Sequence, residues 1–173
     1  LTSRIATPTS VSTSDAVSGK TSVTGSIGRS VRSFSGSGAS SDNASTTWRI
    51  GVNHALGAKT SIRASIYQED KASYSFADSG YLSTGLALSA THTASTRLSY
   101  YATLTLENDD YFQASAAGVT MDDDYFSYTL GCRYRANDDL SLGLSATYSE
   151  NDSAGLAARS YDNMRFTFNA SYS

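Results

Sequence analysis

The charged residues of this sequence that could have a functional role recur at odd-numbered positions between apolar neighbours. In an extended chain, residues two apart project to the same side, so these charges share one polar face. Unpaired arginines on a dry face would be costly, and we expect them to pair, to stack on Tyr67 or Tyr101, or to meet water. The eight residues predicted to share this face are Arg49, Arg63, Glu69, Arg97, Glu107, Arg133, Arg135 and Arg165.

A second group of candidate residues is acidic and flanks one polar stretch. The segments "ENDD" (107–110) and "DDDYF" (122–126) would approach each other if the intervening chain closes a hairpin. Carboxylate clusters suit hard cations such as Ca²⁺ or Mg²⁺, although the spacing is not that of an EF-hand. A solvated acidic loop is the alternative. The candidate cation ligands are Glu107, Asp109, Asp110, Asp122, Asp123 and Asp124.

The sequence lacks a nucleophile, a base and an orienting group at spacings that would bring them together for catalysis. Its only histidines, His54 and His92, lie on the apolar face beside short turns, where an imidazole needs no catalytic explanation. The single cysteine, Cys132, lies on the same face as a small apolar residue. Gly-rich phosphate loops and Cys/His metal spacings are also missing from the sequence. We therefore expect no catalytic residues, no cofactor and no enzyme activity.

The composition indicates one domain with an amphipathic boundary. The 173 residues include 39% hydrophobic residues, 12 tyrosines and a net charge of −3. That charge argues against a nucleic-acid partner, since such binding depends on basic surfaces. No apolar run reaches the roughly 18 residues of a membrane helix. We expect a flexible Ser/Thr-rich leader over residues 1–20 and a β-barrel over residues 21–173.

The pattern after residue 20 alternates almost without interruption, which predicts β-strands. Three short turns are expected at "LGAKTS" (56–61), "THTASTR" (91–97) and "RANDDLS" (135–141), each between two alternating runs. Longer polar stretches alternate with these turns. The eight expected strands cover residues 22–34, 47–56, 60–69, 81–92, 96–107, 125–136, 139–149 and 163–173.

The apolar residues of the last seven strands all have even numbers. The first strand is weaker and has Val23, Ile27 and Val31 at odd positions. The polar face mixes Gly51, Gly85, Gly131 and Gly143 with arginines and tyrosines, as the narrow interior of a small barrel does. The aromatic rings expected to face lipid are Trp48, Tyr100, Phe126, Tyr128, Tyr134, Tyr148, Phe166, Phe168 and Tyr172.

This pattern resembles the small bacterial outer-membrane β-barrels of the OmpA/OmpX-like class. The resemblance covers about residues 21–173 and implies an all-β, eight-stranded, antiparallel up-and-down transmembrane barrel. It implies a polar lumen, an apolar lipid-facing exterior and periplasmic termini. The final run "NMRFTFNASYS" is similar to the alternating last strand that the barrel-assembly machinery reads in this class. Ser173 departs from the usual terminal aromatic residue, so we expect that the natural chain continues to a Phe.

The resemblance implies contacts with outer-membrane lipid, lipopolysaccharide and the barrel-assembly machinery. For function we first expect a non-enzymatic structural, anchoring or surface-interaction barrel, with a protein partner in a larger envelope assembly. The alternative is a small porin-like channel for water or small anions through an Arg-lined lumen. Accessible Arg63 and Arg133 would favour the channel, whereas closed ion pairs would weaken it. A soluble ligand-binding barrel is a third alternative.

Overall fold

The computed structural model describes residues 2–5, 9–35, 41–72, 80–111, 122–154 and 160–172. The regular structure in these ranges is entirely β-strand, in one antiparallel sheet. No helix in this part of the chain is long and apolar enough to cross a membrane. The strands are β1 (Thr2–Ile5), β2 (Thr9–Ser18), β3 (Thr21–Ser35), β4 (Ser41–Ala55), β5 (Thr60–Ala72), β6 (Gly80–Thr93), β7 (Leu98–Tyr111), β8 (Asp122–Arg135), β9 (Leu140–Ala154) and β10 (Tyr161–Tyr172).

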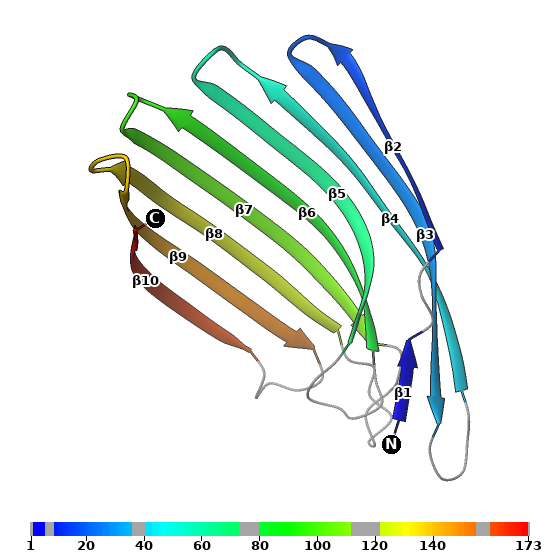
Figure 1. The fold of residues 1–173 in the computed structure, drawn as a ribbon. Helices are drawn as coiled ribbons and strands as arrows, with labels where there is room; N and C mark the ends of the chain where they lie inside the picture. Colours follow the sequence, from blue (N-terminus) through cyan, green and yellow to red (C-terminus); the bar gives the residue numbers. More distant parts are fainter. Residues whose placement is uncertain are drawn as a thin grey trace.

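The strands follow one another in up-and-down order and form a curved wall (Figure 1). From β3 to β10 each strand pairs with the next one in the sequence. At the first edge, β2 pairs with residues 21–29 of β3, and β1 pairs with residues 32–35 of the same strand. At the other edge β10 pairs with β9. Among the described residues no pairing joins these two edges, so the sheet is open.

All eight expected strands are present, and the three expected short turns connect β4 to β5, β6 to β7 and β8 to β9. The structure adds β1 and β2 within residues 1–20, which we expected to be a flexible leader. Ser and Thr residues give this segment little hydrophobic periodicity, although their backbone can still pair with β3. The domain boundary near residue 21 stays a prediction.

Several strands extend further into the polar stretches than the sequence predicted. Strand β4 begins at residue 41 rather than 47, and β9 ends at 154 rather than 149. Hydrogen bonds between polar side chains connect these extensions across neighbouring strands. Ser45 donates to Asp70 at 3.0 Å, and Tyr111 donates to Asp123 at 3.0 Å. Such bonds stabilise polar pairs across strands, whereas hydrophobic alternation alone does not reveal them.

The pairing register keeps apolar residues together on one face across the sheet. Residues that lie directly opposite each other in an antiparallel pair share a face. Val23 lies opposite Val52, and Ile27 lies opposite Trp48. The odd-numbered apolar residues of β3 therefore lie on the same face as the even-numbered ones of β4. The apparent exception in the first expected strand is a shift of numbering between these strands, not a change of face.

The apolar face has the width of a lipid-facing band. On β7 its residues run from Leu98 to Leu106, and the next residues on this face are Asn108 and Asp110. The stretch from residue 98 to residue 106 has the length of the roughly 9 to 11 residues with which a tilted strand crosses the hydrocarbon core. Leu106 is 40% exposed and Leu130 is 58% exposed, so this face is open to its surroundings.

The aromatic rings that we expected to face lipid all lie on this apolar face. Phe126, Tyr128 and Tyr148 cluster at the loop end, with ring centroids 5.5 to 6.4 Å apart. Trp48 lies opposite Ile27 and Gln68 near the same end. The other five rings are Tyr100, Tyr134, Phe166, Phe168 and Tyr172. Of these, Phe166 and Phe168 lie in the middle of β10.

On the polar face, glycines lie directly opposite larger side chains that fold over them. Tyr67 lies opposite Gly85, and a Cβ atom at residue 85 would lie 2.6 Å from the Tyr67 ring. Tyr101 covers Gly131 in the same way. Thr24 covers Gly51 and Asn169 covers Gly143. The glycines predicted for a crowded interior therefore make room for specific cross-strand neighbours.

Gly85→Ala tests this packing. Tyr67 is only 4% exposed, so its ring cannot swing away cheaply, and we expect the free energy of unfolding to fall by about 1 to 3 kcal/mol. The matched control is Gly25→Ala, where an added Cβ meets only Thr13 at 3.9 Å. Equilibrium urea unfolding in lipid vesicles measures both changes. Equal effects at the two glycines would contradict the packing role of Tyr67.

Candidate functional site

The polar face holds one continuous network of charged and aromatic side chains in mid-sheet. The Arg49 guanidinium lies 2.5 Å from Glu69 and 4.3 Å from the centre of the Tyr67 ring. The Tyr67 hydroxyl donates to Glu107 at 2.5 Å, and the Lys71 ammonium lies 2.9 Å from the same carboxylate. Arg49 thus both pairs and stacks, as we expected of arginines on this face.

The other five arginines that we predicted for this face are exposed, unlike Arg49. Arg63, Arg97, Arg133 and Arg135 lie near the short turns of β5 to β8, and Arg165 lies on β10; all five are exposed. Arg63 is opposite Asn53 and Ser89, and Arg133 is opposite Ser99 and Gly143. Neither Arg63 nor Arg133 forms an ion pair within the ranges that the structure describes. The sheet therefore has an exposed basic end and an acidic end.

The acidic hairpin does close, but it divides its carboxylates between the two faces. Asp110 lies opposite Asp122, Asp109 opposite Asp123, and Asn108 opposite Asp124. Because side chains alternate, Glu107, Asp109 and Asp123 are on the polar face and Asp110, Asp122 and Asp124 are on the apolar face. The two acidic segments therefore approach each other as expected, but their six carboxylates do not share one face. Alternation in two paired strands forces this division.

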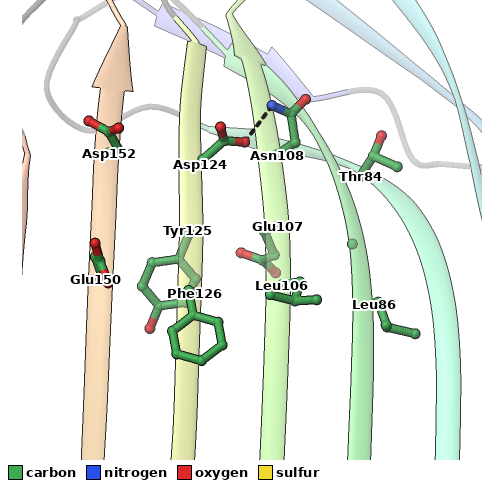
Figure 2. A pocket seen from close by; sticks show the side chains of 11 residues that line it. Thr84, Leu86, Leu106, Glu107, Asn108, Asp124, Tyr125, Phe126, Glu150 and Asp152 are labelled. Carbon is green, nitrogen blue, oxygen red and sulfur yellow. Dashed lines mark hydrogen bonds between the residues drawn. The ribbon is translucent and has the colours of Figure 1, made fainter.

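The outward carboxylates mark the end of the apolar band. A pocket of about 550 Å³ lies here, and its lining shows an upper polar row above a largely apolar row (Figure 2). Asn108 and Asp124 in the upper row are joined by a 3.0 Å hydrogen bond. Leu86, Leu106 and Phe126 form the row below, with Glu150 beside them. This step from apolar to polar is the position expected for lipid headgroups.

The inward carboxylates are more buried. Asp123 is 3% exposed and accepts hydrogen bonds from Ser153 and Tyr111. Burial raises the pKa of Asp109, which lies beyond the apolar band. No group of three or more His, Cys, Asp or Glu side chains in the described residues is arranged to hold a metal ion. The candidate cation site is therefore not formed by these carboxylates.

The two histidines share one arrangement on the apolar face. His54 Nδ1 lies 2.8 Å from the Thr21 hydroxyl, and His92 Nδ1 lies 2.8 Å from the Thr60 hydroxyl. In each pair the threonine is directly across on the neighbouring strand. These contacts give each imidazole a structural partner.

Sequence reasoning missed several members of the polar face near the acidic end. Lys71 was not assigned although it pairs with Glu107. Tyr81, Tyr111, Tyr125 and Tyr161 also lie there, around a cavity. All five residues have odd numbers, so the alternation could have found them. They were missed because they lie in stretches taken as loops or at strand ends.

Tyr67→Phe tests the central hydrogen bond of the network. It removes the donor to Glu107, and we expect a loss of about 1.5 to 3 kcal/mol in the free energy of unfolding, typical of a hydrogen bond to a charged group. Tyr101→Phe is the matched control, since Tyr101 also covers a glycine and no hydrogen bond of its hydroxyl is found in the described part of the chain. Urea titration of both variants in vesicles gives the comparison. A loss at Tyr101 as large as at Tyr67 would rule out the special role of Glu107.

Comparison with known proteins agrees with this architecture. The chain is similar to OmpT, an outer membrane protein of Vibrio cholerae, in its in-vitro folded form (12% identity, TM-score 0.61). It is similar to the same protein with loop L8 deleted (15% identity, TM-score 0.58). These matches cover 91% of this chain but only 52% and 50% of the OmpT chains, so the chain spans about half their length. The NanC porin matches at 13% identity over 95% of this chain and 79% of its own, with a TM-score of 0.49.

The family comparison is more specific than the structural likeness. No curated protein is significantly similar to this chain. Residues 37–172, most of the chain, match the model of the family described as "Putative beta-barrel porin 2". This match excludes the soluble ligand-binding barrel. The chain belongs to the putative beta-barrel porin 2 family, and it is an outer-membrane β-barrel protein with an all-antiparallel sheet.

Proposed function

We propose that this chain forms the wall of a porin-like pore through which small hydrophilic solutes, anions above all, cross the outer membrane passively. The observation that carries the proposal is the exposure of Arg63 and Arg133 on the polar face, without ion pairs in the described ranges. Guanidinium groups stay charged at any physiological pH and attract anions. Charged side chains that line a pore set its selectivity.

The residues between the arginines support a hydrated path. One cross-strand row connects Arg63 on β5 to Arg165 on β10 through small hydroxyl residues. Short side chains leave space in front of the sheet, and their hydroxyl groups can bond to water. Between the two arginines the row contains Ser89, Thr103, Thr129 and Thr147.

The two free edges of the sheet have to find pairing partners if the sheet is to close into a pore. Backbone groups that face lipid must be paired, because hydrocarbon offers them no partner. In the membrane, the edge of β10 and the edge formed by β1 and β2 would therefore pair with each other or with further strands. Further strands would widen the lumen, since barrel diameter grows with strand number.

The remaining features of the proposal follow the resemblance to small outer-membrane barrels. The short turns and both termini would face the periplasm, and the longer connections would face outward. Outer-membrane lipid and lipopolysaccharide would surround the apolar band, and the barrel-assembly machinery would read the last strand. No catalytic role is proposed, since His54 and His92 are both engaged by threonines on the apolar face.

A structural or anchoring barrel that also interacts at the cell surface is the second candidate function. It is favoured by the strand extensions beyond the lipid band, where Asn108 bonds to both Asp122 and Asp124. Polar, ordered strand ends of this kind could hold a protein partner of an envelope assembly. This function requires no open lumen.

Conductance in planar bilayers separates the two functions. After a heat-modifiable gel shift shows that the protein is folded, we expect steady, anion-selective current steps. Arg63→Ala together with Arg133→Ala should lower the anion-to-cation permeability ratio, because both remove positive charge from the pore wall. The matched control is Arg29→Ala, which removes an exposed arginine opposite Thr46 on the apolar face.

The controls decide the outcome. A folded protein that conducts no current would overturn the pore and leave the anchoring function. A permeability ratio that changes equally in the Arg29 control would show that the inward arginines do not set selectivity.

A further inference from the structure

A groove of about 280 Å³ lies on the apolar face near the short turns, across β5 to β8. Small side chains form its floor, because Ala90 lies directly opposite Ala102. Two residues further along the same strands, Leu88 lies opposite Leu104, so larger side chains cover the sheet there. The residues whose side chains border the groove are Thr60, Ala90, His92, Tyr100, Ala102 and Leu130.

One end of this groove is polar. His92 Nδ1 lies 2.8 Å from the Thr60 hydroxyl, and Tyr100 lies directly opposite His92. The backbone of Thr93 donates to the carbonyl of Lys59 at 2.7 Å, which holds the turn before β5 at the same level. Lys59 is exposed and forms no ion pair within the ranges that the structure describes. Hydrogen-bond donors and a positive charge therefore lie together at this end.

The imidazole of His92 has a second nitrogen that needs a partner. In the part of the chain that the structure describes, no hydrogen bond of Nε2 accompanies the contact of Nδ1 with Thr60. His92 is exposed on the face that meets lipid, where hydrocarbon offers a polar group nothing to bond to. In the tautomer in which Thr60 donates to Nδ1, Nε2 carries the ring proton and can donate. The acceptors that a membrane offers at this depth are the oxygen atoms of a lipid headgroup.

The apolar part of the groove also needs an occupant. Ala90 and Ala102 leave a hollow in a face that is otherwise covered by larger side chains. If the hollow stayed empty, its lining would lose dispersion contacts. The groove is continuous with the lipid-facing band, so hydrocarbon chains have direct access to it. Its volume suits a segment of one chain, since sites that enclose a whole small molecule are about 300 Å³ or more.

We propose that this groove binds one phospholipid molecule with an anionic headgroup. An acyl chain would lie over Ala90 and Ala102 beside Leu130, while the phosphate accepts hydrogen bonds from His92 Nε2 and the Tyr100 hydroxyl. Lys59 adds the positive charge that attracts anionic lipid. The inference goes beyond the proposed pore, because the groove is on the opposite face from the lumen and needs no conduction. With the short turns in the periplasm, the lipid would belong to the periplasmic leaflet.

Native mass spectrometry of the folded protein in detergent tests the site, because each bound lipid adds its own mass. The probes are dioleoylphosphatidylglycerol and dioleoylglycerol, which has the same chains and no phosphate. We expect one saturable site for the phosphatidylglycerol and at least about tenfold weaker binding of dioleoylglycerol, as for hydrogen bonds to a charged acceptor. Equal affinity for the two lipids, or no saturable binding, would overturn the proposal.

Filling the floor of the groove locates the acyl chain. Ala102→Leu should weaken phosphatidylglycerol binding by about tenfold or more, because the chain loses contact with several methylene groups. The matched control is Ala146→Leu, which makes the same change in the same cross-strand row on β9, outside the groove, and should leave binding unchanged. If Ala102→Leu shows no heat-modifiable gel shift, Ala90→Leu fills the same floor from β6. Unchanged binding in the folded groove variant, or an equal loss in the control, would overturn the site.

Replacing each histidine locates the phosphate. His92→Ala should weaken phosphatidylglycerol binding by about tenfold and leave dioleoylglycerol binding unchanged, since only the phosphate contact is lost. His54→Ala is the matched control, because His54 also contacts a threonine across the strands but lies opposite Ile62, outside the groove. Equal losses in the two variants, or an equal loss for both lipids, would refute the headgroup contact.

Discussion

A strand that crosses a membrane at the lipid boundary has to present apolar side chains on one face while its backbone groups pair with both neighbours. Lipid imposes both requirements, since it tolerates neither exposed charge nor unpaired backbone. The register satisfies both requirements for β4 to β9, which have a paired neighbour on each side, because each apolar residue lies opposite another residue of the same face. A slip of one residue in any pair would reverse all the faces beyond it. The polar face, with its arginines and tyrosines, is positioned as a consequence of this register.

On the polar face, contacts between neighbouring residues of different size and charge hold the side chains in place. Tyr67 fits over Gly85, stacks under Arg49 and donates to Glu107. The glycine makes space for the ring, and the charged groups fix the ring in place. The same face is then polarised along the strands, with exposed arginines near the short turns and buried carboxylates near the long connections. A solute that moves along this face would meet positive charge at one end of the sheet and negative charge at the other.

Much of this arrangement could be predicted from the sequence, because alternation is a strong signal where one face is apolar. It located eight strands, three turns and the faces of Arg49 and Glu69. It could not locate β2, whose Ser and Thr residues give no contrast between faces. The alternation was not applied to Asp109 and Asp110, because the expected strand ended at residue 107; β7 continues to Tyr111 and places the two residues on opposite faces. Lys71 and Tyr161 were missed where polar strand ends looked like loops.

In the membrane, the odd-numbered face of β7 and β9 has to meet water and the even-numbered face has to meet lipid. Single cysteines in a Cys132→Ala background test it directly, by labelling with a water-soluble maleimide in proteoliposomes. We expect Thr103→Cys and Ser145→Cys to react, whereas Leu104→Cys and Ala146→Cys are protected. Equal reactivity at neighbouring positions, or protection of the odd ones, would contradict it.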